Sequence, residues 1–404
     1  MKYDFDRIID RTGTGASKWE RYTAGKTDNL NLLIDPHLKG DSTLPMWVAD
    51  MDFQVPQPVI DALVKRSAHG IFGYTVASKS YFRSIIDWFL ARYNWKIEEE
   101  WIIPAPGVVP AIQFAINVLC KPEEKILIQG PVYHPFYRVI KSAGCEIVSN
   151  SLRLDASGYN MDFSDLGRQL SDPLVKLAIL CSPHNPVGRV WTVDELTRFG
   201  ELCDSNGVTV IADEIHCDLV FSSNRFIPYG SIKPDFLNNV LICTAPSKTF
   251  NLAGMHLSNI IIPNELLRHR YKSYIEKNSL SGGLNPLALS AAEVAYQEGE
   301  EWLEQVLDYV WENYQFLQRS FGDHLSKLSV SDLQGTYLAW VDFRSLGIEV
   351  NELERLIQSE ANLLFNQGYI FGREGIGFQR INIACPRSVL ERAVKRLIKV
   401  FAHL

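Results

Sequence analysis

Short apolar runs alternate with amphipathic stretches through the middle of the chain. The apolar runs predict strands at Lys125–Gln129, Cys145–Ser149, Val175–Cys181, Val208–Ala212, Val240–Thr244 and Asn259–Ile262. A capping box at Thr192–Glu195 opens one of the intervening helices, which we expect to end near Asn206 and Gly207. Continuous apolar strands separated by helices are typical of a sheet that is buried on both faces and is largely parallel.

The flanking regions are mainly helical. Before the strands, apolar residues at three-to-four spacing predict helices within Pro56–Ala68 and Ser80–Tyr93. After them come a long helical region from Pro286 to about Phe321, strands at Thr336–Asp342 and Gly377–Ala384, and helices at Glu352–Glu360 and Ser388–Phe401. This second pattern predicts a smaller α+β domain.

We therefore predict an α/β protein in three parts. Residues 1–50 form an arm with a short helix that packs with the small domain. Residues 51–285 form a large domain with a mainly parallel sheet, and residues 286–404 form the small domain. The uncharged stretch Trp101–Cys120 is long enough to cross a bilayer. Because it contains three prolines and a glycine, we interpret it as a strand end, a loop and a buried helix.

Composition narrows the functional classes. The chain has 404 residues, of which 46% are hydrophobic and 22% charged, as in folded globular proteins. Its net charge of -7 and the lack of a long basic block argue against general binding of nucleic acid or membrane surfaces. The N-terminus shows no apolar core of a signal peptide. Seven scattered cysteines without a CxxC pair indicate neither a disulfide framework nor a zinc ribbon, and they fit a reducing cytoplasm. The histidines lack metal-ligand spacing, so no metal is expected.

Polar residues follow three successive strands where each strand ends. Asn185 lies in SPHNPVG after the first strand, Asp213 begins DEIH after the second, and Ser247 and Lys248 follow the third. Ligands gather at the carboxyl ends of parallel strands. Singly, these residues are typical of a turn, a helix cap and a surface site. An ammonium directly after a buried strand is costly, so Lys248 must reach solvent, reach a partner, or lose its charge by bonding to something.

Four motifs together carry a resemblance to a known family. SPHNPVGR, ADEIHCDLVF, APSKTFNLAG and GFQRINIACPRS resemble the fold-type I pyridoxal-phosphate enzymes. More narrowly, the chain is similar to the cystathionine β-lyase branch (MalY/PatB-type, cysteine-S-conjugate β-lyase) of the class I/II aminotransferase superfamily. The likeness extends from WVADMDF to the C-terminal region. It implies an aminotransferase-like fold, pyridoxal 5'-phosphate as the cofactor, and a homodimer with shared active sites.

The resemblance also implies roles at the cofactor ring. Lys248 would bond the aldehyde of the cofactor and act as the general base. Asp213 would face the ring nitrogen, Asn185 would donate to the phenolic oxygen and help hold the substrate carboxylate, and Tyr133 would stack on the ring. His216 stands where many members of the superfamily carry a tyrosine that donates to the phenolic oxygen, which favours the β-lyase branch.

The phosphate and the substrate have their own expected residues. Gly107, Val108 and Val109 precede an apolar helix and suit an anion site, with Ser247 as a further donor. Tyr74 resembles a tyrosine that reaches the phosphate from the partner subunit. By the same resemblance, Arg380 clamps the α-carboxylate of the substrate, and Trp47, Ala49 and Asp50 line the entrance.

These expectations point to an α,β-elimination. The substrate would be cystathionine or a related cysteine S-conjugate, and the products a thiol, pyruvate and ammonia. Two alternatives stay open: a pyridoxal-phosphate-dependent aminotransferase acting on an L-amino acid, and a non-catalytic regulatory protein on the same fold.

Overall fold

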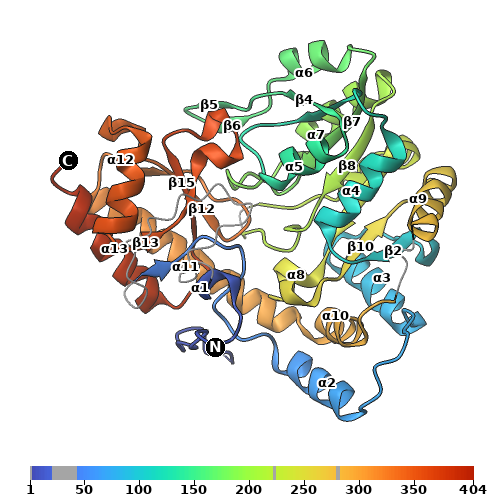
Figure 1. Ribbon diagram of the computed structural model, residues 1–404, viewed down its shortest axis with the longest axis horizontal. Coiled ribbons are helices and arrows are strands. Elements are labelled where there is room, and N and C mark those ends of the chain that lie inside the picture. Colours follow the sequence, from blue (N-terminus) through green and yellow to red (C-terminus); the bar gives the residue numbers. More distant parts are fainter. Residues whose placement is uncertain (1, 21–42, 222–223, 279–282) are drawn as a thin grey trace.

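A seven-stranded sheet forms the centre of the larger part of the molecule (Figure 1). The computed structural model describes residues 2–20, 43–221, 224–278 and 283–404. The strand order is β2 (Ile102–Ala105), β10 (Ser258–Ile261), β9 (Val240–Thr244), β8 (Thr209–Asp213), β7 (Val175–Cys181), β3 (Lys125–Ile128) and β4 (Glu146–Ser149). Pairs from β9 to β4 are parallel. The predicted α/β class with a mainly parallel sheet is therefore confirmed, although β10 runs antiparallel to both its neighbours.

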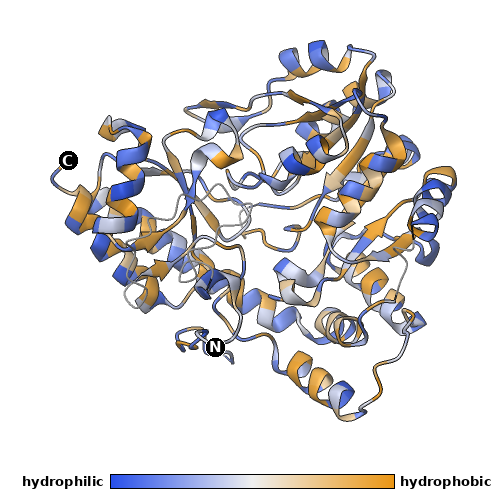
Figure 2. Cartoon of the chain, in the orientation of Figure 1, coloured by the Kyte–Doolittle hydropathy of each residue, from blue (hydrophilic) through white to orange (hydrophobic). Residues whose placement is uncertain are grey.

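Both faces of this sheet are buried, as the uninterrupted apolar strands predict. Along β7, Leu177 and Ile179 belong to one hydrophobic cluster, whereas Ala178 and Leu180 belong to another. Successive side chains of a strand point to opposite faces, so the two clusters are the two faces of the sheet. Figure 2 shows hydrophobic colour concentrated on these strands, whereas peripheral helices carry much hydrophilic colour.

The predicted helices occur, with one correction. Helices of the larger part are α2 (Gln57–Ala68), α3 (Lys79–Tyr93), α4 (Val108–Leu119), α5 (Pro135–Ser142), α6 (Phe163–Leu170), α7 (Val193–Ser205), α8 (Pro246–Thr249) and α9 (Glu265–Lys277). The Thr192 capping box is present. The long helical region is broken into α10 (Pro286–Glu298) and α11 (Glu300–His324). A Cβ at Gly299 would lie 2.4 Å from the Phe250 ring and 2.3 Å from the Ala295 carbonyl oxygen, so close packing requires glycine at the break.

A second sheet of four antiparallel strands lies in the C-terminal part. Its order is β11 (Ser329–Val330), β12 (Leu338–Asp342), β15 (Phe378–Asn382) and β14 (Asn366–Gln367). Helices α11 and α13 (Arg387–Phe401) pack together beside it, and α12 (Val350–Arg355) continues into a π turn at Leu356–Glu360 (Figure 1). A small hairpin joins β5 (Arg153–Asp155) to β6 (Gly158–Asn160).

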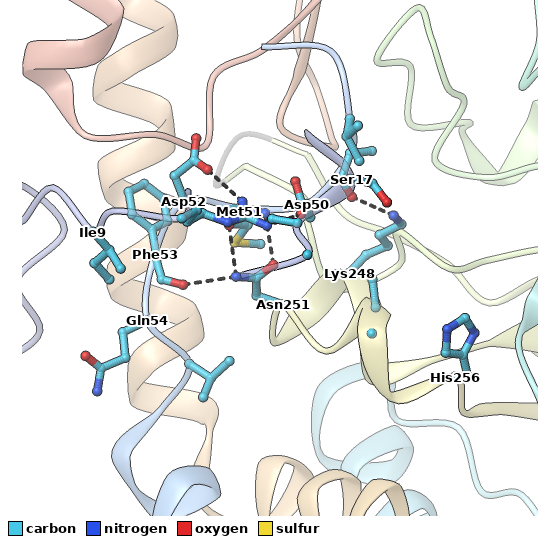
Figure 3. Close-up of a pocket in the computed structure, with 18 residues that line it drawn as sticks. Ile9, Ser17, Asp50, Met51, Asp52, Phe53, Gln54, Lys248, Asn251 and His256 are labelled. Carbon is cyan, nitrogen blue, oxygen red and sulfur yellow. Dashed lines mark hydrogen bonds and ion pairs between the residues drawn. The ribbon is translucent and has the colours of Figure 1, made fainter. Parts of the chain in front are cut away.

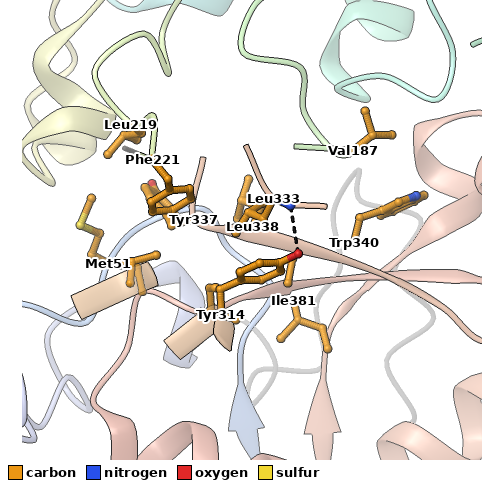
Figure 4. Packing of buried hydrophobic residues seen from close by; sticks show 14 of the residues in the cluster. Met51, Val187, Leu219, Phe221, Tyr314, Leu333, Tyr337, Leu338, Trp340 and Ile381 are labelled. Atoms are coloured by element: carbon orange, nitrogen blue, oxygen red, sulfur yellow. Dashed lines mark hydrogen bonds between the residues drawn. The ribbon is translucent and has the colours of Figure 1, made fainter. Parts of the chain in front are cut away.

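The N-terminal region contacts the C-terminal sheet, where the Asn382 backbone N–H of β15 donates to the Met46 carbonyl oxygen at 2.9 Å. Its short strand β1 (Leu44–Pro45) pairs with β13 (Leu363–Leu364), and α1 (Ser17–Glu20) precedes it. Met51 packs in the cluster around Tyr337 (Figure 4). Residues 21–42 of the predicted arm lie outside the described residues. The boundaries at 50 and 285 stay predictions; α10, just beyond the second, packs on α2 and α3.

Within the described ranges, no helix has the length and apolar character needed to cross a membrane. The uncharged stretch Trp101–Cys120 forms β2, a loop and helix α4, as interpreted from its prolines and glycine, although only one face of α4 is buried.

Candidate active site

The three strands whose ends carry the polar motifs are adjacent in the sheet. Cys181 of β7 is level with Asp213 of β8, and Asp213 is level with Cys243 of β9. The loops that follow these three strands therefore lie together at one edge of the sheet. They line a cavity of about 390 Å³ whose walls include Ala49, Gly107, Val108, Val109, Tyr133, Asn185, Asp213, His216, Ser247 and Lys248. Ten residues predicted from the sequence thus share one cavity.

Lys248 lies in the first turn of α8, which begins directly after β9. Its Nζ donates to the Ala49 carbonyl oxygen at 2.6 Å, and the Tyr337 hydroxyl donates to the same oxygen at 2.8 Å. Burial lowers the pKa of Lys248 to about 8, against the attraction of Asp50 and Asp213. The amine is therefore much easier to deprotonate than that of an exposed lysine, as nucleophilic and base chemistry require.

Asp213 is a buried carboxylate with little protein compensation. Among the described residues it accepts one hydrogen bond, from the Ile215 backbone N–H at 3.2 Å. Burial raises the pKa of Asp213 to about 7. A carboxylate held in this way is suited to a ligand that brings its own positive N–H, because that charge would offset the cost of burial.

Arg380, on β15, crosses from the C-terminal sheet into this site. Its guanidinium donates to the Asn185 side-chain oxygen at 2.9 Å, to the Trp47 carbonyl oxygen at 3.1 Å, and to the Asn366 side-chain oxygen. Burial lowers the pKa of Arg380 to about 10. Among the described residues, no carboxylate pairs with it and its Nε has no hydrogen-bond partner. A buried guanidinium whose charge no carboxylate neutralises is ready to bind an anion.

Two helix N-termini border the cavity. Gly107 precedes α4 with φ 125°, a backbone conformation that favours glycine, and no side chain caps that helix. Ser247 lies in the first turn of α8. Uncapped backbone N–H groups at a helix start bind phosphate groups well. The helix N-termini at Gly107 and Ser247 fit the phosphate of pyridoxal phosphate, the Asp213 carboxylate fits its ring nitrogen, and the Lys248 amine fits its aldehyde.

His216 and Tyr133 form further parts of the wall. Burial, with Lys248 and Arg380 nearby, holds the pKa of His216 well below its usual value, so the ring is neutral. Its Nδ1 has no partner among the described residues and is available to a ligand. Burial raises the pKa of Tyr133 to about 12, so its hydroxyl stays protonated.

Four predicted residues do not line the cavity itself. Arg380 reaches it through the bond to Asn185, and Asp50 lines a neighbouring cavity. Tyr74 is fully exposed, at 103% of its reference area, on the connection between α2 and α3. The Trp47 indole donates to the Lys18 carbonyl oxygen at 3.1 Å, so Trp47 reaches the site only through its own carbonyl group, which binds Arg380.

Sequence reasoning missed the side chains that hold residues 47–53. Figure 3 shows this segment beside Lys248, along a second cavity of about 790 Å³ that Asp50 and Arg11 also line. Arg11 pairs with Asp50 at 2.6 Å and with Asp52 at 2.8 Å, and the fully buried Lys18 pairs with Asp52 at 2.6 Å. Arg11 and Lys18 lie in a polar stretch of weak periodicity, and the only signal was their charge.

The described residues contain no group of three or more His, Cys, Asp or Glu side chains placed to hold a metal ion.

Comparison with known proteins identifies the family to which the chain is similar. The family described as aminotransferase class I and II matches residues 45–397. The chain is 38% identical to cystathionine beta-lyase PatB of Bacillus subtilis, over 98% of each chain.

Solved structures give the same result. Cystalysin from Treponema denticola, which contains a pyridoxal 5'-phosphate cofactor, is 35% identical, with a TM-score of 0.93 over 99% of each chain. The pyridoxal-phosphate-bound C-S lyase from Staphylococcus hominis is 31% identical, with a TM-score of 0.89 over 99% of this chain and 98% of the other.

Proposed function

The chain belongs to the aminotransferase class I and II family, and from this premise we propose that it is a pyridoxal-phosphate-dependent carbon–sulfur β-lyase. It cleaves cystathionine, or a related cysteine S-conjugate, with water to give a thiol, pyruvate and ammonia. The relatives named cystathionine beta-lyase and C-S lyase support this reaction. The observation that carries the proposal is the convergence of Lys248, Asp213, Asn185 and Arg380 from four separate segments.

The cofactor, when bound, supplies an aldehyde for an amino group and a ring that withdraws electrons from the substrate Cα. Lys248 would hold that aldehyde, and the Asp213 carboxylate would stabilise a proton on the ring nitrogen. Tyr133 would stack on the ring, and His216 and Asn185 would contact the phenolic oxygen. The phosphate would be held by backbone N–H groups of Gly107, Val108 and Val109 and by the hydroxyl of Ser247. The family resemblance and the shared cavity support these assignments.

The substrate is held and deprotonated by side chains whose properties suit those tasks. Arg380 binds the α-carboxylate with its planar guanidinium, and Asn185 fixes the orientation of that guanidinium. Lys248 removes the Cα proton. Because burial lowers the pKa of Lys248 to about 8, an appreciable fraction of the amine is neutral near pH 7. The bound cofactor would supply the electron withdrawal that allows the thiolate to leave from Cβ.

The test is to supply cystathionine, or an S-conjugate of cysteine, to the cofactor-loaded protein without a keto-acid acceptor. Pyruvate and free thiol should appear in equal amounts. In the wild type, borohydride reduction should fix the cofactor to the peptide that contains Lys248. Lys248→Ala should abolish both products and this label, whereas Lys96→Ala, at an exposed lysine, should change neither. Product formation only after a keto acid is added would identify an aminotransferase. No labelling and no turnover would favour a non-catalytic regulatory protein.

The protein works as a homodimer in the cytoplasm, with Tyr74 of one subunit serving the phosphate of the other. The exposed apolar side chains Ile71, Phe72, Tyr74 and Val76 on one connection support this arrangement. Mixing Tyr74→Ala and Lys248→Ala subunits tests it. Each hybrid dimer would contain one intact site, so roughly a quarter of wild-type activity should return. No gain on mixing would place Tyr74 in its own subunit's site or outside any site.

A further inference from the structure

Asp218 is a buried carboxylate in the ADEIHCDLVF motif that has no part in the chemistry above. It lies two residues after His216, in the loop that follows β8, and is 4% exposed. It accepts hydrogen bonds from the Trp88 indole at 3.0 Å, from the Tyr93 hydroxyl and from the Thr249 hydroxyl at 2.7 Å. The last of these donors is the residue directly after Lys248.

The charge of Asp218 is compensated within the larger part of the molecule. The Arg92 guanidinium lies 3.4 Å from its carboxylate and 5.0 Å above the Trp88 ring. Trp88, Arg92 and Tyr93 all belong to α3. A buried carboxylate with three hydrogen bonds and one guanidinium is a well-satisfied anchor, in contrast to Asp213, which accepts one bond.

Through its bond to Thr249, Asp218 holds a short helix. Helix α8 has four residues, Pro246–Thr249, and no side chain caps its N-terminus. A single helical turn has little stability of its own. Thr249 is fully buried, and the next residue, Phe250, packs edge-on against Trp88 with ring centroids 5.5 Å apart. The backbone of Lys248 is thus held from its C-terminal side.

We propose that Asp218 is a positioning residue that fixes Lys248 relative to Asp213 through its bond to Thr249. Asp213 is the last residue of β8 and Asp218 lies in the loop that follows it, whereas Lys248 and Thr249 share the turn after β9. One hydrogen bond therefore ties the segment carrying the ring-nitrogen carboxylate to the segment carrying the amine. The inference rests on the proposed function for its purpose, but the effect on Lys248 exists without any turnover.

The test compares Thr249→Val, which keeps the shape and removes the hydroxyl, with Thr249→Ser, which keeps the hydroxyl. The control is Thr244→Val, which removes another buried threonine hydroxyl, bonded to the Asn259 carbonyl oxygen at 3.1 Å. In the cofactor-free protein, the pH dependence of Lys248 acylation is followed by mass spectrometry of the Lys248 peptide. In the loaded protein, kcat and KM are measured separately.

Thr249→Val should move the Lys248 labelling profile upward by at least half a pH unit, because a loosened turn lets water reach the amine. It should also lower kcat roughly tenfold with little change in KM. Thr249→Ser should keep kcat within about twofold of the wild-type value and leave the Lys248 labelling profile at its wild-type pH. Thr244→Val should lower the unfolding temperature without moving the labelling profile.

The proposal is overturned if Thr249→Val behaves like Thr244→Val, with a lower unfolding temperature but an unchanged profile and kcat. If Thr249→Val does not fold, Thr249→Ala removes the same hydroxyl without adding an atom and is judged by the same outcomes. The labelling experiment needs no substrate. A protein without lyase activity can therefore still show the shift, which separates failure of this proposal from failure of the proposed function.

Discussion

Lys248 lies between two regions that are built in different ways. On one side are the ends of β7, β8 and β9, which backbone ladders hold in register. On the other side is the segment 47–53, whose backbone groups are bound mainly by side chains. Asn251 exchanges hydrogen bonds with Met51 and donates to Phe53, and Asn382 donates to the carbonyl oxygens of Val48 and Asp50.

The difference decides what each region offers to a ligand. Because the sheet satisfies its own backbone, the side chains of Asp213 and Ser247 at its edge are left for the cavity. In the segment, the carboxylates of Asp50 and Asp52 are used to bind Arg11 and Lys18. What it offers to the site is mainly the Trp47 and Ala49 carbonyl groups, which bind Arg380 and Lys248. We therefore expect substitutions on the sheet side to affect the chemistry, and those on the segment side to affect stability and the placement of Lys248.

The largest effect should come from Asp213→Asn on the sheet side. A neutral amide cannot balance a cationic ring nitrogen, so kcat/KM should fall about a thousandfold, the equivalent of about 4 kcal/mol. At pH values above 7, the cofactor-free variant should be more stable than the cofactor-free wild type. The pKa of Asp213 is raised to about 7, so above this pH the buried negative charge of the wild type opposes folding. Steady-state kinetics and urea unfolding measure the two effects. Reduced stability together with full activity would contradict the assignment.

On the segment side, Lys18→Met should lower the free energy of unfolding by about 3 kcal/mol, because Asp52 loses a fully buried partner at 2.6 Å. The matched control is Lys2→Met, which removes an exposed lysine paired with Glu301 at 2.8 Å and should have only a small effect. Urea unfolding at one pH compares the two. Equal losses would mean that the buried pair is no stronger than a surface pair.

Lys248 lies between the two regions, and the pH dependence of stability should report the protonation of its amine. Its pKa in the folded protein, about 8, lies below the ordinary value of 10.5. The unfolded chain therefore binds more protons between these values, and the stability of the cofactor-free protein should rise with pH across this window. Relative to Lys248→Met, the gain should be about 2 to 3 kcal/mol. Parallel stability curves for the two proteins from pH 8 to 10.5 would rule out the buried amine as the cause.

The smallest effect should come from Asp50→Asn. The Asp50 carboxylate raises the proton affinity of Lys248 from the segment side, so its loss should lower the Lys248 pKa by about half a unit. Amine labelling of the cofactor-free protein at a series of pH values measures the shift. Asp52→Asn, which removes the neighbouring carboxylate, serves as the control. An equal shift in both variants would mean that a loosened segment, rather than the charge of Asp50, controls the amine.

Much of the sheet side could be predicted from the sequence because its signals are local. Val175–Cys181 and Val240–Thr244 are strands with the predicted bounds, and Thr192 caps α7 as predicted. Since parallel strands bring their carboxyl ends to one edge, the order of the strands along the chain was enough to place Asn185, Asp213 and Lys248 together. Their proposed roles followed from the family resemblance.

The segment side was beyond such reasoning. The ion pairs of Lys18 and Arg11 join residues more than thirty positions apart, and no periodic pattern marks a residue that will be buried by such a pair. The antiparallel direction of β10 and the break at Gly299 were missed for a similar reason. Strand direction depends on the path of the connection, and the glycine at 299 is required by the Phe250 ring, which approaches from elsewhere in the fold.

The sequence by itself determined where the backbone forms strands and helices and which reactive side chains stand at the strand ends, because periodicity and chain order act over a few residues. Only the tertiary structure decided that the Ala49 carbonyl oxygen binds both Lys248 and Tyr337, and that Asp218 holds the turn of Lys248 through Thr249. Burial and the distances between charges arise when remote segments pack together. They change an ordinary lysine into one whose pKa is about 8.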